Sequence, residues 1–355
     1  MKSLVIKAGA RAAAHIREQG LQPRDIAAIF GASGAAKWLA IYGLDRAITA
    51  EWLPRLAQPV ALYGTSIGAW KLMATASAEP VAALTTLANA YIEQRYDKKI
   101  TQAAINRETD KIAAQLLGEG APHAILNNPK LHLAMGASRC RGLLAGDSKV
   151  AQALGFGQVK LANQINRRHL GRYLERTVFY DPRRPPAITG SDGLTTHTVA
   201  LTTDNFRAAA MASAAIPLVI PPEKNIAGAP AGVYRDGGLV DYHPVPGHFW
   251  RQPGLILYPH FYDHLVPGWL DKNNRSRYGQ GSLVEDVILL APSAEFMASL
   301  PNQRLPDRLD FKHYLGCDDE RIKIWRQCAA ASERLGEEFL SLWQQERLVE
   351  RLVEF

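Results

Sequence analysis

The chain has 355 residues and a formal net charge of +7, and its content of 47% hydrophobic and 21% charged residues is ordinary for a globular protein. This length allows one large domain or two small ones. The basic residues are spread along the chain rather than gathered in blocks, which speaks against a nucleic-acid partner. The positive charge suits an anionic substrate or an anionic membrane surface.

Cysteine content and hydropathy exclude two further classes. The three cysteines form no C-x-x-C pair, which argues against a disulfide scaffold and a structural zinc site. Basic residues interrupt the N-terminal apolar stretch, so no secretory signal is predicted, and no apolar run reaches the roughly 18 residues of a transmembrane helix. We expect a soluble, cytoplasmic protein whose contact with a membrane, if it has one, is peripheral.

The first part of the chain alternates helical and strand-like segments. Residues 4–19 mix small apolar and basic side chains and predict a helix. The apolar run IAAIFG at 26–31 predicts a strand, with a helix behind it over 35–50. A second β-rich run at 59–63 leads into an apolar helix over 67–78. This order is typical of strand–helix units with parallel strands.

The middle of the chain is less regular. Residues 82–118 predict helix ended by glycines, and residues 130–138 alternate like a strand. Residues 139–176 contain several glycines and the basic run NRRHLGRYLER, and they predict an insertion over one end of the sheet. Asp204 is the expected N-cap of the next helix. Three further strands are predicted, at 197–203, 254–259 and 285–291.

The C-terminal residues 318–355 have an amphipathic pattern that predicts helix throughout. No internal repeat or low-complexity segment is visible. Taken together, the alternating elements predict an α/β protein with a parallel sheet and helices on both faces.

A strand-to-helix turn carries the pentapeptide from Gly64 to Gly68, G-T-S-I-G, which fits the nucleophile-elbow pattern G-x-S-x-G. The strained turn leaves no room for side chains two residues before and after the serine. Because a β-rich run precedes the motif and an apolar helical run follows it, Ser66 is predicted to be an exposed nucleophile at a helix N-terminus.

A second glycine turn, GASGAAK, ends in Lys37. It lacks the second glycine and the metal-binding hydroxyl of a P-loop, and the chain has no G-x-G-x-x-G fingerprint, so no nucleotide site is predicted. The N–H groups from Ser33 to Ala36 open a helix and favour an anion. That anion can be the oxyanion of an acyl-transfer intermediate.

A serine nucleophile needs a base, and the residues leave two kinds open. His243 and His260 follow strand-like runs, as a Ser-His-Asp triad would allow. Alternatively, Asp236 stands at the end of a strand and is followed by Gly237 and Gly238, which permit a tight turn.

Four blocks within residues 26–245 together resemble the patatin-like phospholipase family, in the order that the family has them. They are the turn Ser33–Lys37, the elbow Gly64–Gly68, the block Ala212–Pro217 with the pair Pro221-Pro222, and Asp236–Gly238. One departure is that the usual run of consecutive glycines is replaced by G-A-S-G-A-A. The main-chain donors survive this change.

The resemblance implies a three-layer α/β/α fold with a mostly parallel central sheet, and a Ser-Asp dyad without histidine. Ser66 would be the nucleophile and Asp236 the base. The oxyanion hole would be the turn of Ser33, Gly34 and Ala35, with Lys37 in the family's basic position. Four glycines would support the elbow and the turn after the base, namely Gly64, Gly68, Gly237 and Gly238. No metal or organic cofactor is implied.

The expected activity is hydrolysis of a carboxylic ester bond in a lipid, whether phospholipid, lysophospholipid or acylglycerol, by an enzyme of phospholipase A or lysophospholipase type. Two alternatives stay open: a Ser-His-Asp esterase on small soluble esters, and a non-catalytic lipid-binding protein of the same fold. We expect residues 1–300 to form the catalytic domain, with 139–176 as a helical insertion over the site. Residues 301–355 would be a helical extension packed on this domain.

Overall fold

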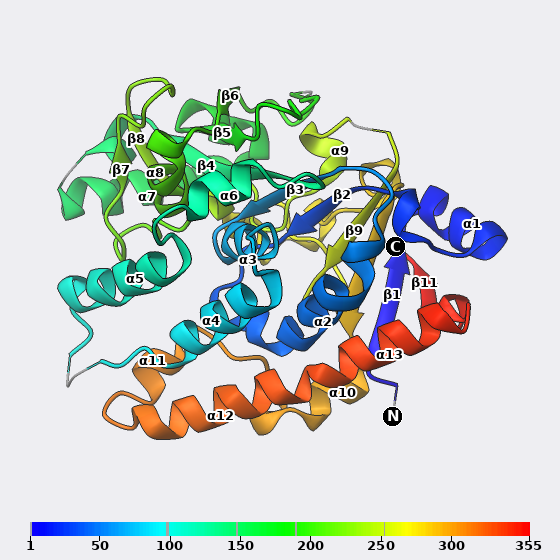
Figure 1. Ribbon diagram of the computed structural model, residues 1–355. Coiled ribbons are helices and arrows are strands. Elements are labelled where there is room, and N and C mark those ends of the chain that lie inside the picture. Colours follow the sequence, from blue (N-terminus) through cyan, green and yellow to red (C-terminus); the bar gives the residue numbers. More distant parts are fainter. Residues whose placement is uncertain (1, 97–98, 147, 189, 252) are drawn as a thin grey trace.

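The computed structural model describes residues 2–96, 99–146, 148–188, 190–251 and 253–355. A large central sheet crosses the molecule, with helices packed around it (Figure 1). The strands are β1 (Leu4–Ala8), β2 (Ile26–Gly31), β3 (Val60–Thr65), β4 (Leu131–Cys140), β5 (Leu174–Tyr180), β6 (Thr196–Ala200), β7 (Glu223–Lys224), β8 (Val233–Asp236), β9 (Leu255–Pro259), β10 (Val287–Pro292) and β11 (Leu352–Glu354).

The strand order is β11-β1-β10-β9-β2-β3-β4-β5-β6, and β8 pairs with β4 beside this path. The run β10-β9-β2-β3-β4 is parallel. Every residue of β2, β3, β9 and β10 is buried, which is why these strands are continuous apolar runs rather than alternating ones. The α/β class and the mostly parallel sheet predicted from the sequence are confirmed.

The helices are α1 (Ala10–Gln19), α2 (Tyr42–Ala47), α3 (Ile67–Thr75), α4 (Pro80–Ile92), α5 (Gln102–Leu116), α6 (Ala121–Leu126), α7 (Lys149–Ile165), α8 (Thr203–Ser213), α9 (Pro246–Phe249), α10 (Ala294–Ser299), α11 (Asp310–His313), α12 (Asp318–Ala331) and α13 (Glu333–Gln344). Helix α3 packs on β2, β3 and β4. Helices α12 and α13 pack in turn on α2 and α4, as an outer row along the molecule (Figure 1). None of the described helices has the length and apolarity needed to span a bilayer.

The predicted helix over 4–19 is wrong in its first half. Residues 4–8 form β1, whose side chains alternate between buried and half-buried and which pairs antiparallel with β10. Gly9 lies between the strand and α1. No larger residue fits at this position, because a Cβ atom there would lie 1.9 Å from the Val284 carbonyl oxygen. The short strand was hidden by the helical pattern of the residues that follow it.

Two other predicted helices are also shorter than expected. Residues 82–118 contain both α4 and α5, and the Thr101 side chain caps the second by accepting from the Ala104 N–H. In the C-terminal segment, α12 and α13 are followed by β11, which adds to the sheet beside β1 instead of continuing as helix. The predicted cap of α8 is off by two residues, since Thr202 rather than Asp204 accepts the N–H of Asn205.

Helix α7 is the main feature of the segment 139–176, and it lies between β4 and β5. These two strands pair directly with one another, antiparallel, so the chain leaves the sheet, forms α7 and returns beside the same strand. In Figure 1 the helix lies at the side of the molecule that also carries α5 and β8.

Candidate active site

Ser66 lies in the sharp turn between β3 and α3, with φ 52° and ψ −129°. A non-glycine residue in this region of backbone space is strained, and such strain collects at functional sites. The turn is held by close backbone contact. A Cβ atom at Gly68 would lie 2.3 Å from the backbone of Gly31, and one at Gly64 would lie 2.6 Å from the backbone of Gly68. The glycines of the pentapeptide are therefore required by packing.

The sheet register brings Asp236 to this turn. Thr65 at the end of β3 pairs with Gly136 of β4, and the next residue, Ala137, pairs with Asp236 at the end of β8. Because β5 occupies the other edge of β4 over residues 134–140, β3 and β8 lie end to end along one edge of β4, and their last residues are adjacent. The Ser66 hydroxyl donates to Asp236 Oδ2 over 2.8 Å. Two residues 170 positions apart in the sequence meet because their strands end at consecutive positions along the same edge of β4.

The Asp236 carboxylate is buried, with 7% of the residue exposed. Its Oδ1 accepts the Gly238 N–H over 2.7 Å, so each carboxylate oxygen has one donor. Burial raises the pKa of Asp236 to about 6, and the hydrogen bonds from Ser66 and Gly238 oppose this rise without cancelling it. A carboxylate with this pKa is ionised at neutral pH and is a much better proton acceptor than an exposed aspartate.

Gly237 and Gly238 are both required by space. A Cβ atom at Gly237 would lie 2.2 Å from the Gly136 carbonyl oxygen, and one at Gly238 would lie 2.6 Å from the Ser33 hydroxyl. The turn after the aspartate therefore packs directly on β4 and on the glycine turn. This is the physical reason for the D-G-G sequence.

Ser213, at the end of α8, holds the two members of the pair in place. Its hydroxyl accepts the Ser66 N–H over 3.0 Å and donates to the Gly136 carbonyl over 2.7 Å. Two residues later, the Ala215 carbonyl accepts the Asp236 N–H. The sequence analysis assigned no role to Ser213, although its position within the A-S-x-A-x-P block was the available signal.

The glycine turn faces the same spot. The Ser33 N–H donates to the Tyr242 carbonyl, and the Ser33 hydroxyl bonds with Thr65 Oγ1 over 2.9 Å. Ser33 therefore anchors the turn. Among the described residues, no acceptor is bonded to the N–H groups of Gly34 and Ala35. Gly34 and Ala35 line the same pocket as Ser66.

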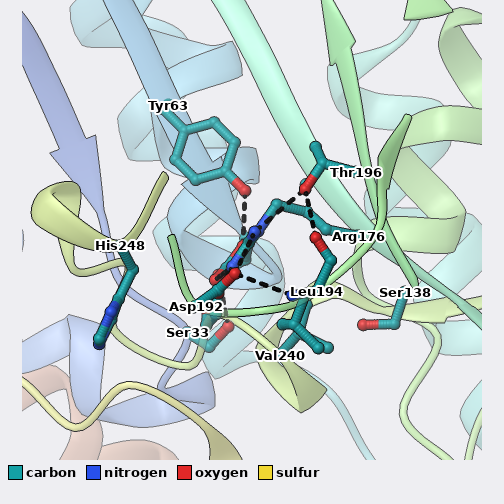
Figure 2. Close-up of polar contacts among 12 residues, drawn as sticks. Ser33, Tyr63, Ser138, Arg176, Asp192, Leu194, Thr196, Val240 and His248 are labelled. Carbon is teal, nitrogen blue, oxygen red and sulfur yellow. Dashed lines mark hydrogen bonds and ion pairs between the residues drawn. The ribbon is translucent and has the colours of Figure 1, made fainter. Parts of the chain in front are cut away.

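A buried ionic network lies next to the glycine turn and is connected to it through Thr65 (Figure 2). The Arg176 guanidinium is fully buried and pairs with Asp241 over 2.7 Å and with Asp192 over 2.5 Å. The Tyr63 hydroxyl donates to Asp241 over 2.9 Å, and Thr65 Oγ1 donates to the Asp241 carbonyl. Because an incompletely paired buried charge is costly, this network holds the chain around Asp241 in one position.

Two hollows meet at Ser66. One, of about 570 Å³, is lined by the glycine turn and by charged side chains, namely Lys37, Asp236, Lys272, Asp307 and Arg308, and is called the polar pocket. The other, of about 1450 Å³, is a mostly apolar groove. Its apolar lining comes from α3 to α5, from the segment after α8, and from α11, and includes Trp70, Tyr91, Ile105, Ile112, Ile220 and Phe311.

Charge in the polar pocket is unbalanced. The Lys37 ammonium forms an ion pair with Asp307. Within the described chain, no carboxylate forms an ion pair with Lys272 or Arg308. The Lys272 ammonium lies 4.2 Å from the centre of the Tyr242 ring. Burial, together with the charges of Lys37 and Arg308, lowers the pKa of Lys272 to about 8. The lining of this pocket thus holds three basic side chains, Lys37, Lys272 and Arg308, and two carboxylates, Asp236 and Asp307.

The two histidines considered as bases lie elsewhere. His243 and His260 are fully buried, and their rings contact one another with centroids 4.3 Å apart. His243 Nδ1 accepts the Val266 N–H, and His260 Nδ1 accepts the Tyr262 N–H. Burial lowers the pKa of His260 to about 3 and that of His243 well below its usual value. Neither ring is bonded to Ser66 among the described contacts.

Sequence reasoning missed the residues of the polar pocket that lie late in the chain. Lys272, Asp307 and Arg308 belong to no motif, and they reach the site only because their loops fold back over it. No group of His, Cys, Asp or Glu side chains in the described residues is placed to hold a metal ion.

Comparison with known proteins adds the family. A search of curated proteins found no match. Residues 31–247 match the family model described as patatin-like phospholipase, which covers more than half of the 355 residues. The match begins at the glycine turn and ends just after the D-G-G turn, so it contains the elbow, Ser213 and Asp236. The chain therefore belongs to the patatin-like phospholipase family, a family of lipid acyl hydrolases.

Proposed function

We propose that this protein hydrolyses carboxylic ester bonds of lipids through a catalytic dyad of Ser66 and Asp236. The observation that carries the proposal is the 2.8 Å hydrogen bond from the Ser66 hydroxyl to a buried carboxylate, at a strained elbow where an apolar groove meets a cationic pocket. A nucleophile bonded to its base is the geometry that covalent acyl transfer needs.

In the first half-reaction, Ser66 Oγ attacks the acyl carbonyl while Asp236 Oδ2 takes its proton. The carbonyl oxygen becomes an oxyanion, which the N–H groups of Gly34 and Ala35 stabilise. The C–O bond to the lipid alcohol then breaks, and Asp236 gives its proton to the departing oxygen. In the second half-reaction, water attacks the acyl-enzyme, gives a proton to Asp236, and releases the fatty acid as Ser66 recovers its hydrogen.

The two hollows assign the two ends of the substrate. The apolar groove suits an acyl chain, since its lining is aromatic and aliphatic and it begins at Ser66. The polar pocket suits a phosphate on the alcohol side, since Lys272 and Arg308 lack carboxylate partners within the described residues. We therefore propose a phospholipid or lysophospholipid as the substrate, ahead of an acylglycerol, and contact with the membrane surface that supplies it.

We further propose that residues 1–300 act as the catalytic domain and that residues 301–355 are an extension packed on it. Asp307 and Arg308 support a share of the extension in binding the substrate, because both line the polar pocket. The segment 139–176 is proposed to stand beside the site, since Lys149 of α7 lines the apolar groove.

The experiment is a panel of phospholipids, lysophospholipids, acylglycerols and chromogenic short-chain esters, run with wild-type protein and Ser66→Ala. A fluorophosphonate probe reports on the same serine independently of substrate choice. We expect turnover and labelling in the wild type, and neither in folded Ser66→Ala. Equal turnover in both proteins would refute the dyad. Absence of both turnover and labelling in the folded wild type would favour a lipid-binding protein without catalysis.

A further inference from the structure

Helix α7 carries an apolar stripe on its outer side. Val150, Leu154, Leu161 and Ile165 are 70%, 61%, 63% and 77% exposed. At 3.6 residues per turn these four side chains fall within about 60° of arc, along about 22 Å of helix. We call these four residues the α7 stripe. Soluble proteins rarely leave a continuous apolar surface of this kind in water without using it.

The stripe is separate from the face by which α7 packs on the protein. The opposite side of α7 is buried through Gly155, Val159 and Asn163. The Asn163 amide donates to Asp271 over 2.9 Å, and Asp271 in turn pairs with Arg167 over 2.6 Å. The helix is therefore fixed to the body of the protein by its inner face, and the stripe faces outward from a firm base.

The segment of chain that carries the stripe has charges of one sign. Residues 148–174 contain no aspartate or glutamate. Four basic residues in this segment are exposed, namely Lys149, Lys160, Arg168 and Arg172. None of the four forms an ion pair within the part of the chain that the structure describes. An apolar stripe with unpaired basic side chains at its margins is the pattern of a helix that lies in a lipid interface.

Helix α7 comes next to both hollows of the candidate site through residues other than the four of the stripe. Lys149, at its start, lines the apolar groove together with Leu218 and Leu309, which are themselves 43% and 63% exposed. On its inner side, the Phe156 ring contacts the edge of Trp269, with centroids 6.5 Å apart, and Trp269 lines the polar pocket. Helix α5 supplies another part of the lining of this groove, through Ile105 and Ile112.

We propose that the α7 stripe docks the protein on an anionic lipid surface. The four apolar side chains enter the boundary between head groups and acyl chains, and the basic side chains contact lipid phosphates. Docking on this side brings the mouth of the apolar groove to the membrane. The inference rests on the proposed function in one respect, namely that the groove accepts an acyl chain from that membrane.

A second copy of the chain is a poorer occupant. In a twofold dimer the same patch meets itself, so the basic margins of the two copies would face one another without acidic partners. Like charges brought together in this way oppose association. An anionic bilayer offers the complementary charge along the whole length of the stripe.

The test is co-sedimentation with vesicles, using Ser66→Ala as the background so that lipid is not consumed. Vesicles of phosphatidylcholine alone are compared with vesicles that also contain phosphatidylglycerol. The stripe variant carries Val150→Gln, Leu154→Gln, Leu161→Gln and Ile165→Gln, since glutamine keeps helix propensity. A matched control carries Val349→Gln and Val353→Gln, two residues that are 49% and 48% exposed near β11, across the molecule from α7 (Figure 1).

We expect the background protein and the control to bind phosphatidylglycerol vesicles, and the stripe variant to bind at least about tenfold more weakly. Replacing Lys160, Arg168 and Arg172 by glutamine should cost about fivefold per residue at low salt, and the loss should shrink as salt rises. With Ser66 restored, the stripe variant should hydrolyse a soluble short-chain ester at the wild-type rate, which shows that it is folded.

Three results would overturn the proposal: no binding by the background protein, equal binding by the stripe variant, or a dimer that the stripe variant dissolves while vesicle binding persists. The last result would identify the stripe as a contact between copies. If vesicle binding behaves as expected but Ser66→Ala still hydrolyses esters in solution, the docking surface stands and the proposed catalytic dyad fails.

Discussion

The part of the site that would perform the reaction and the part that would recognise the substrate are built differently. Ser66, Asp236 and the glycine turn lie within the family match, and close contacts made by glycines hold them, most of these contacts with backbone. Lys272 and Arg308 lie beyond the match and reach the pocket as long side chains. A close backbone contact tolerates no added atom, whereas a long side chain can be exchanged without moving the chain. The first part is therefore readable from sequence motifs and the second is not.

The largest effect is expected when the proposed base, Asp236, is replaced. Asp236→Asn keeps the size of the side chain and its bond from the Gly238 N–H but cannot take the serine proton. We expect kcat to fall on the order of 10⁴–10⁶-fold with the fold intact, as losses at catalytic serines and their bases do. Steady-state kinetics with circular dichroism checks this.

His243→Gln and His260→Gln are the matched controls for Asp236→Asn, because both rings are buried and neither is bonded to Ser66 among the described contacts. Each should keep most of its activity if it folds. A folded but inactive histidine variant beside an active Asp236→Asn would reverse the assignment and favour a Ser-His-Asp esterase.

The next largest effect is expected at the oxyanion turn. A Cβ atom at Gly34 would lie 2.4 Å from the Phe261 ring, so Gly34→Ala must displace either the ring or the turn. If the turn moves, the N–H groups of Gly34 and Ala35 no longer point at the oxyanion, and kcat should fall by about 10²–10³-fold.

Lys37→Met, in the same turn, removes the ammonium group but no main-chain N–H. It should therefore lower kcat far less than Gly34→Ala does. Adding Phe261→Leu to Gly34→Ala removes the ring atoms that collide, and should return part of the lost rate. Near-normal kcat in Gly34→Ala alone would show that the turn is only structural.

A smaller and more selective effect is expected in the polar pocket. Lys272→Met with Arg308→Met removes the two cations that lack a carboxylate partner within the described residues. Hydrogen bonds to charged groups are worth about 1.5–3 kcal/mol each, so each single replacement should raise KM for a phospholipid about tenfold to a hundredfold, and the double replacement should raise it further. Hydrolysis of an acylglycerol with the same acyl chain should be unchanged, and equal losses on both substrates would contradict a phosphate site.

The smallest effects are expected in the pH profile, where each limb belongs to one part of the site. Asp236 acts only when deprotonated, so kcat/KM should be halved near pH 6 and fall about tenfold per unit below it, for every substrate. Lys272 loses its charge as pH rises through about 8, so an alkaline fall should appear for phospholipids alone. In Lys272→Met the acid limb should remain and the alkaline limb should vanish.

Much of the fold could be predicted because its central strands are continuous apolar runs with helices between them. The errors have local causes. At residues 4–8 a five-residue strand stands directly before a helix of similar composition. At β11 three residues become a strand because the edge of β1 is there to receive them, a long-range pairing that no local pattern records.

The candidate site divides in the same way. Ser66, Asp236 and the glycines around them could be proposed from the sequence, because close packing requires glycine at fixed positions and so produces a recognisable motif. Ser213 stood within a recognised block, yet its contact with the Ser66 N–H depends on how α8 docks on β4. Lys37 was placed at the turn, but its partner Asp307 lies 270 residues further along and could be known only from the fold.

The pairing of β1 with β10 and β11 also bears on how the protein is made. Residues 4–8 leave the ribosome before residues 9–286 are made, and their partners at 287–292 and 352–354 follow only after that stretch. Through that interval the β1 strand has two unpaired edges, and such edges recruit other strands. Chaperone demand during translation should therefore centre on β1, while the Ser66 elbow, whose strands β3, β4 and β8 are complete once Asp236 has been made, can assemble earlier.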